Sequence, residues 1–168
     1  YARLRLFCFP HAGAGVLSFR PWSGLLPAEI ELCPVQLPGR EDRFREPPYQ
    51  DAGEIAAVLA RVLYPYEVSR PFAFFGHSMG AIVAFELAHQ MLRQYGVKPV
   101  HLFVSARCAP QWTASRPPTY SLPDPQFKAQ LKLLNGTPEE LLDEADPAFL
   151  RLLRADFSVN ETYHAEPR

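Results

Sequence analysis

The sequence predicts an α/β fold in which a parallel sheet is covered by helices on both faces. Four short apolar runs, at residues 4–9, 31–37, 71–76 and 100–105, have the length of buried strands. Segments with helical spacing or capping signals separate these runs. Strands that alternate with helices require right-handed crossovers, and the result is a parallel sheet with a helical layer on each side.

Length and composition favour a single globular domain. The chain has 168 residues, of which 48% are hydrophobic and 21% charged, with a net charge of −1. No basic stripe is present, so we expect neither nucleic acid nor a membrane as a partner. The beginning of the chain has no long apolar segment, and no signal peptide is predicted.

The three cysteines, Cys8, Cys33 and Cys108, lie among apolar residues on predicted strands. An odd number of cysteines in such positions indicates buried free thiols in a reducing cytoplasm. We therefore expect a cytoplasmic protein without disulfides, metal or cofactor.

The first strand, at residues 4–9, is followed by a loop of small residues at 10–15. Such a loop is either a flexible glycine turn or a backbone that offers N–H groups to a site above the sheet. A short helical segment at 18–26 follows. The second strand contains Pro34, which cannot donate a ladder hydrogen bond, so this strand is predicted at a sheet edge.

Arg40 lies in a charged turn, residues 38–43. It either binds an anionic group or pairs with a neighbouring acid, and we favour pairing. Asp51 and Glu54 then form a capping box for a helix with an apolar face, and Pro65 and Pro71 are predicted to bracket the exit of that helix.

The third strand leads directly into Gly76-His-Ser-Met-Gly80, and an apolar helix predicted over 79–95 follows at once and ends at Gly96. A strand, a sharp Gly-x-Ser-x-Gly turn and a helix are the context of a nucleophile elbow, with Ser78 at its apex. The alternative is an ordinary turn in which Ser78 caps the helix. His89 and His101, which have no partner at ligand spacing, are interpreted as structural.

From residue 112 onward the strand pattern stops and three short capped helices are predicted, at 124–134, 138–144 and 147–157. Asn135-Gly136 is predicted to close the first of them and Thr137-Pro138 to open the second. These helices are either a lid over the site, spanning about 110–157, or a plain helical layer.

Four motifs together resemble the type II thioesterases, the stand-alone α/β-hydrolases that accompany polyketide and nonribosomal peptide synthetases. The motifs are Leu6-Phe-Cys-Phe-Pro-His-Ala-Gly13, Gln36-Leu-Pro-Gly-Arg-Glu41, Phe74-Phe-Gly-His-Ser-Met-Gly80 and Leu153-Arg-Ala-Asp156. They occur in the order of the family and cover essentially the whole chain.

The resemblance implies that Ser78 is the nucleophile, which accepts an acyl group from a phosphopantetheine thioester on an acyl or peptidyl carrier protein. It implies an oxyanion hole made by the backbone N–H groups of Met79 and Ala12, and a lid over an acyl channel. The family order is serine, acid, histidine. The triad acid and histidine are not found in this chain, and His164 is not expected to be the base.

We therefore interpret residues 1–168 as the N-terminal two-thirds of an α/β-hydrolase domain, with the C-terminal strands missing and little activity expected of this part alone. The predicted function is hydrolysis of acyl thioesters on carrier proteins. Two alternatives remain: an esterase or acyltransferase on the same scaffold, and a truncated protein that binds acyl chains or carrier proteins without turnover.

Overall fold

A four-stranded parallel sheet with the order β2-β1-β3-β4 forms the centre of the protein. In this computed structural model the described residues are 2–67, 70–111, 117–134 and 139–165. The strands are β1 (Leu4–Phe9), β2 (Ile30–Pro34), β3 (Phe72–His77) and β4 (His101–Ser105). The predicted α/β class with parallel strands is confirmed.

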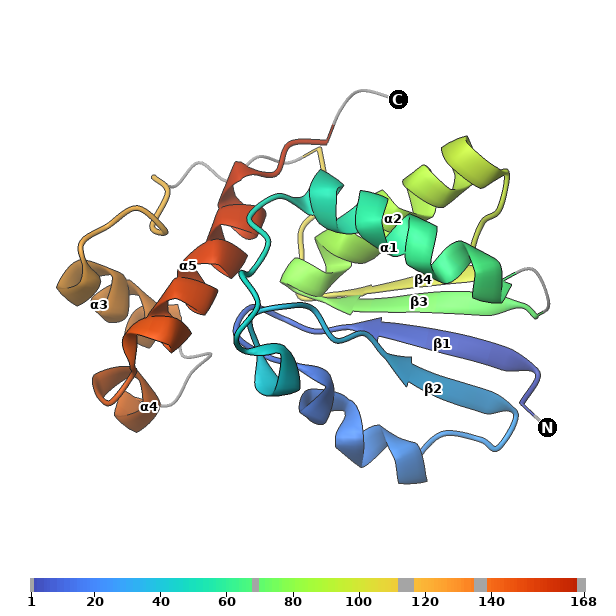
Figure 1. The fold of residues 1–168 in the computed structure, drawn as a ribbon, viewed down its shortest axis with the longest axis horizontal. Helices are drawn as coiled ribbons and strands as arrows, with labels where there is room; N and C mark the ends of the chain where they lie inside the picture. The colour runs from blue at the N-terminus through green and yellow to red at the C-terminus, as the bar shows by residue number, and fades with distance from the viewer. Residues whose placement is uncertain (1, 68–69, 112–116, 135–138, 166–168) are drawn as a thin grey trace.

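One face of the sheet is covered by α1 (Ala52–Glu67) and α2 (Met79–Tyr95), as Figure 1 shows. Alternate side chains of β1 and β3 point to this face, and they form the larger core together with both helices. The aromatic rings of Phe9 and Phe74 meet edge to face there, with centroids 5.5 Å apart. Both side chains are completely buried, so the two central strands are fixed in register beneath the helices.

The opposite face carries a smaller core under the 3-10 helix η1 (Val16–Gly24). Phe19 and Trp22 of η1 pack against each other and against Phe75 of β3. The helical segment expected at 18–26 is therefore present, though as a 3-10 helix that contains Pro21. Helices cover both faces, and the two layers differ in thickness.

The two edge strands are β2 and β4. The prediction that Pro34 places its strand at an edge is confirmed. On β4 the side chains of Phe103 and Val104 are 46% and 58% exposed, respectively, which is high for strand residues of this type.

The N-cap half of the capping box predicted for α1 is present, because the Glu54 N–H donates to Asp51 Oδ1 at 2.8 Å. The prediction that Pro65 and Pro71 bracket the exit of this helix holds for Pro71 only. Pro65 lies within its last turn, and the helix continues to Glu67. Packing of α1 on α2, with the stacked rings of Tyr64 and Tyr95 at 4.1 Å, maintains the helix past the proline.

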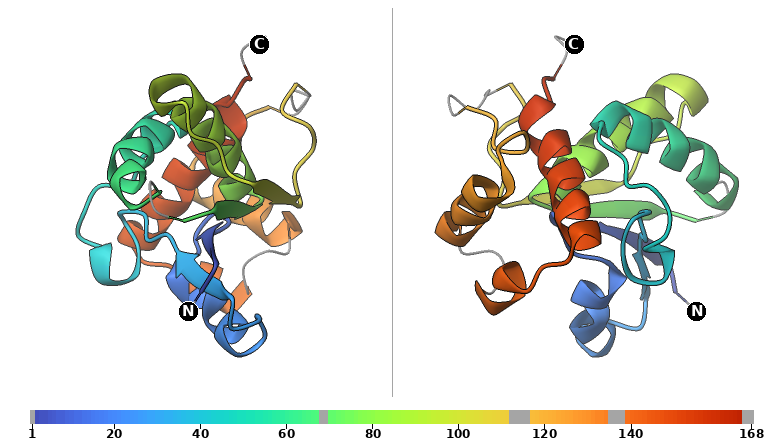
Figure 2. Two further views of the ribbon diagram at one scale, coloured as in Figure 1. Left: turned by 90° about the vertical axis from the view of Figure 1, so that its right-hand side faces the viewer. Right: turned by 60° about the vertical axis from the view of Figure 1, so that its left-hand side comes forward.

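A helical layer lies at the carboxyl end of the sheet and consists of α3 (Asp124–Leu134), α4 (Glu139–Asp143) and α5 (Pro147–Thr162). Figures 1 and 2 show α5 running across the ends of the strands, with α3 and α4 on its far side. The three helices share a small core of Phe127, Leu131, Leu142 and Leu153. The three predicted helices are confirmed; the cap at Asn135-Gly136 and the start at Thr137-Pro138 lie outside the described residues.

The cysteine prediction holds only in part. None of the three cysteines, all of which are described, forms a disulfide, but Cys108 is exposed and follows β4 instead of lying on it. Cys8 is buried on β1, and burial raises the pKa of its thiol to about 12. None of the helices that the structure describes is long and apolar enough to cross a membrane.

Candidate active site

Ser78 stands at the turn between β3 and α2, where its backbone adopts φ 53° and ψ −111°. A positive φ is uncommon for a residue with a side chain and marks local strain. The Ser78 N–H donates to the carbonyl oxygen of Ser105 at 2.9 Å, which ties the turn to the end of β4. The Ser78 side chain makes no capping hydrogen bond to α2, so the alternative role as a simple helix cap has no support.

Two glycines allow this turn to close. A Cβ placed on Gly76 would lie 2.5 Å from the Ala81 Cα, and a Cβ on Gly80 would lie 2.5 Å from the Phe9 carbonyl carbon. Both contacts are with backbone, which cannot move aside as a flexible side chain could. The glycines thus let the helix approach the strands closely, and this approach places Ser78 at the carboxyl end of the sheet.

The two predicted oxyanion donors belong to different segments. Met79 is the first residue of α2, so its N–H has no acceptor within the helix. Ala12 lies in the loop after β1, which we call the oxyanion loop and define as residues 10–15. Within this loop the Ala14 N–H donates to the His11 carbonyl oxygen at 3.1 Å. The assignment of Met79 and Ala12 as donors stays a prediction.

A buried ion pair joins the oxyanion loop to α5. The guanidinium of Arg40 donates to both oxygens of Asp156, from Nη1 to Oδ2 at 2.9 Å and from Nη2 to Oδ1 at 2.8 Å. The same Nη1 donates to the Ala14 carbonyl oxygen at 3.0 Å, and the Gly13 N–H donates to Asp156 Oδ2 at 2.8 Å. The acid predicted to pair with Arg40 is therefore no sequence neighbour, because Asp156 lies 116 residues further along the chain.

Burial raises the pKa of the Asp156 carboxyl above its ordinary value, while the charge and hydrogen bonds of Arg40 and the Gly13 N–H act in the opposite direction. The side chains of Arg40 and Asp156 are only 3% and 2% exposed. A carboxylate so far from water depends on its hydrogen-bond donors. The two residues therefore act as one unit.

The histidines near Ser78 have other contacts. His77 Nδ1 lies 3.0 Å from Ser105 Oγ, and the ring of His77 meets that of His11 edge to face at 5.6 Å. Burial and the neighbouring His77 lower the pKa of His11, and Asp156 raises it to a smaller extent. His164 is exposed beyond the end of α5. His89 packs on Phe85, as expected for a structural residue.

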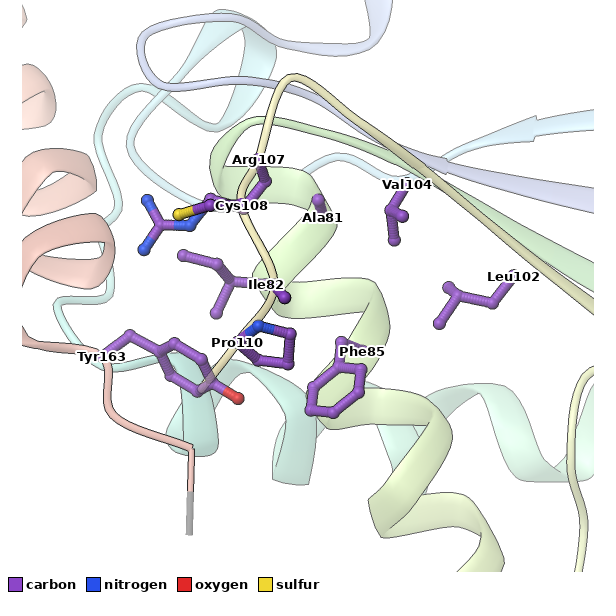
Figure 3. A pocket seen from close by; sticks show the side chains of 10 residues that line it. Ala81, Ile82, Phe85, Leu102, Val104, Arg107, Cys108, Pro110 and Tyr163 are labelled. Carbon is purple, nitrogen blue, oxygen red and sulfur yellow. The ribbon is translucent and has the colours of Figure 1, made fainter. Parts of the chain in front are cut away.

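An apolar cavity of about 380 Å³ begins one helical turn after Ser78. Figure 3 shows Ala81, Ile82 and Phe85 of α2 on one side of it, and the segment after β4 with Tyr163 on the other. The Tyr163 hydroxyl donates to Glu86 of α2 at 2.6 Å, which connects the chain after α5 to the cavity wall. Among the described residues, none from α3 or α4 lines this cavity, so the predicted channel beneath those helices stays a prediction.

Sequence reasoning noted Asp156 within a motif but assigned it no role. The signal was present: Asp156 occupies the face of α5 that also carries Leu152, Leu153 and Val159, all buried. An acid on an apolar helix face requires a buried partner. That partner, Arg40, lies 116 residues away in the sequence, so the sequence pattern could not identify it.

The fold and the elbow define a protein with the α/β-hydrolase architecture. A model of the thioesterase domain matches residues 4–168. The gramicidin S biosynthesis protein GrsT of Aneurinibacillus migulanus is 48% identical over 164 residues, which cover 96% of this chain and 64% of that protein. This chain therefore belongs to the thioesterase family.

Solved structures agree. RedJ, a thioesterase from the prodiginine pathway of Streptomyces coelicolor, is 40% identical with a TM-score of 0.86 over 99% of this chain and 63% of its own. BorB, a type II thioesterase from the borrelidin biosynthetic cluster, is 37% identical with a TM-score of 0.85 over 98% of this chain and 67% of its own. The resemblance to type II thioesterases is confirmed. The chain spans less than two thirds of GrsT and of RedJ.

Proposed function

We propose that the protein containing this chain is a serine hydrolase that removes acyl groups from the phosphopantetheine of acyl or peptidyl carrier proteins. The observation that carries the proposal is the strained Ser78 at the elbow, whose side chain is not used to cap α2. Strain of this kind persists where the surrounding structure enforces it, and it is concentrated at active sites.

In the proposed reaction Ser78 Oγ attacks the thioester carbonyl carbon while its proton passes to a general base, and the carbonyl oxygen becomes an oxyanion. The N–H groups of Met79 and Ala12 donate to that oxyanion. The C–S bond then breaks, the pantetheine thiolate leaves, and water hydrolyses the acyl-serine ester. A thiolate leaves readily, so most of the barrier lies in activating the serine and stabilising the oxyanion.

The apolar cavity beside α2 supports an acyl substrate. Its lining is mainly hydrocarbon, with Ile82, Phe85 and Leu102 among the contributors, and it also includes Arg107 and Tyr163. It begins close to the helix start that carries the Met79 N–H. We assign the acyl chain to this cavity. The carrier protein as partner rests on the relatives, whose names place them in gramicidin S and borrelidin biosynthesis.

We assign no general base to the histidines described here, because His11 and His77 contact each other and His77 also contacts Ser105. We propose that the base and its acid come from outside residues 1–168. Residues 1–168 alone should then show only the rate that an oxyanion hole and binding provide, about 10³ to 10⁴ over water in other serine hydrolases. Hydrolysis at the rate of the complete natural protein would contradict this.

The decisive experiment compares Ser78→Ala with Ser23→Ala in the protein expressed from its complete natural reading frame. Ser23 is exposed, and its hydroxyl donates to the nearby Arg20 carbonyl oxygen. With acyl-carrier thioesters as substrates, we expect Ser78→Ala to lower kcat by about 10⁴-fold or more and Ser23→Ala to leave it unchanged. Full activity of Ser78→Ala would refute the proposal, and faster turnover of simple oxygen esters would favour an esterase.

A further inference from the structure

We propose that Asp156 is a positioning residue for catalysis: it holds the Gly13 N–H and so fixes the direction in which the preceding Ala12 N–H points. The role depends on the proposed oxyanion hole and deepens that proposal. Asp156 lies on α5, in the helical layer. The donor that it positions, the Ala12 N–H, lies in the oxyanion loop, which follows β1 of the sheet. The helical layer would thus take part in catalysis without touching the substrate.

The oxyanion loop is fixed at two points with Ala12 between them. On one side the carbonyl oxygen of Pro10 lies against Gly80, where a Cβ would be only 2.8 Å from it. On the other side Gly13 has φ +78° and donates to Asp156 Oδ2 at 2.8 Å. A Cβ on Gly13 would meet the side chain of Leu153 at 2.7 Å, so α5 lies directly on the loop. The carboxylate is thus the hydrogen-bond acceptor that holds the second point.

Arg40 orients this carboxylate. Its two parallel hydrogen bonds to Asp156 fix the plane of the carboxylate, because the guanidinium is itself planar and rigid. The same Nη1 holds the Ala14 carbonyl oxygen, so the loop is gripped on both sides of the Gly13–Ala14 peptide. Arg40 Nε also faces the Pro38 carbonyl oxygen at 3.4 Å, which orients the guanidinium within its own turn.

Stability alone does not account for such a pair. Burying two charges costs roughly as much as their attraction returns, and apolar replacements of similar size are often as stable. Geometry at an oxyanion hole is far more sensitive. A displacement of about 1 Å can cost on the order of 10² in rate, and loss of one donor costs about 10² to 10³. The pair therefore fits a positioning role better than a stabilising one.

The test separates these two roles with the double variant Arg40→Met/Asp156→Leu, made in the complete natural protein. It replaces the ion pair by apolar side chains and removes the acceptor of the Gly13 N–H. We expect a melting temperature near that of the wild type, a kcat lowered about 10- to 100-fold, and a nearly unchanged KM. A purely structural role predicts instead that kcat recovers together with stability, and that result would overturn the proposal.

Asp124→Asn is the matched control. Asp124 of α3 pairs at 2.6 Å with Arg154, which lies on α5 as Asp156 does but on the exposed side of that helix. We expect this variant to keep wild-type kcat. If the double variant does not fold, Asp156→Ala, which removes the acceptor of the Gly13 N–H, is assayed well below its melting temperature. A kcat equal to that of Asp124→Asn then overturns the proposal, and a loss of about 10-fold or more at constant KM supports it. An active Ser78→Ala would refute the proposed function itself, whereas an inactive Ser78→Ala with a fully active double variant refutes only the role of Asp156.

Discussion

In the sheet, backbone lies against backbone: Gly80 of α2 touches the end of β1, and the turn that carries Ser78 is bonded to the end of β4. In the helical layer, side chains lie against side chains, in a small core that contains Phe127 and Leu142. The sheet therefore holds Ser78 with contacts that tolerate no added atom. The layer can repack around a lost group, and its helix α5 contacts the oxyanion loop through Asp156 and Leu153.

In the sheet, we expect the largest loss of stability from Gly80→Ala. The new Cβ would collide with the carbonyl group of Phe9, and neither segment can move without opening the sheet. We expect the free energy of unfolding to fall by more than about 4 kcal/mol, as measured by urea denaturation. Gly24→Ala is the control, because a Cβ there meets nothing within 4 Å. Equal stability of the two variants would disprove the close packing at the elbow.

Phe127→Ala tests the packing of the helical layer. Its ring is completely buried, packs edge to face on Phe157 and lies beneath the Arg154 guanidinium. We expect a loss of about 3 kcal/mol from the removed ring and the cavity that it leaves. Hydrogen exchange should become faster in α3 and α4 and stay unchanged in β3. Leu133→Ala, at an exposed position of the same helix, is the control, and equal acceleration in β3 would show that the two halves unfold together.

The smallest expected effect concerns His11, which lies in the oxyanion loop between the sheet and the helical layer. Its pKa is lowered in the folded protein by burial and by His77, against a weaker opposing effect of Asp156. As the pH falls below the ordinary value of 6.5, the unfolded chain takes up a proton that the folded chain does not. Stability should therefore decrease with falling pH in this window. His11→Gln should flatten this part of the curve of urea midpoint against pH; an unchanged curve would assign the decrease to other groups.

The sheet half was the more predictable from sequence. Its strands are short apolar runs, and the elbow is a local pattern in which glycine spacing, strand and helix all lie within about twenty residues. Pro34 marked its strand as an edge by its missing N–H alone. Features of this kind depend on neighbours along the chain, and a single sequence contains them.

The contacts between the halves were less predictable. Arg40 was expected to pair with a nearby acid, yet its partner is 116 residues away, and no periodicity relates the two positions. Cys108 was expected to be buried on a strand, but β4 ends at Ser105 and the chain leaves the sheet before it. Pro65 was expected to end a helix whose packing carries it further. In each case contacts between distant parts of the chain determine the outcome, and the local composition of the sequence does not reveal those contacts.

The backbone of Ser78 has a consequence for how this chain can change over time. At φ 53° and ψ −111° a serine costs about 1 to 3 kcal/mol that a glycine would largely avoid. Drift under selection for folding alone would therefore favour the substitution Ser78→Gly, and the hydroxyl would be lost. On the proposed role of Ser78 as nucleophile, selection for chemistry retains the serine in this conformation, and descendants released from that selection should show the change first at this position.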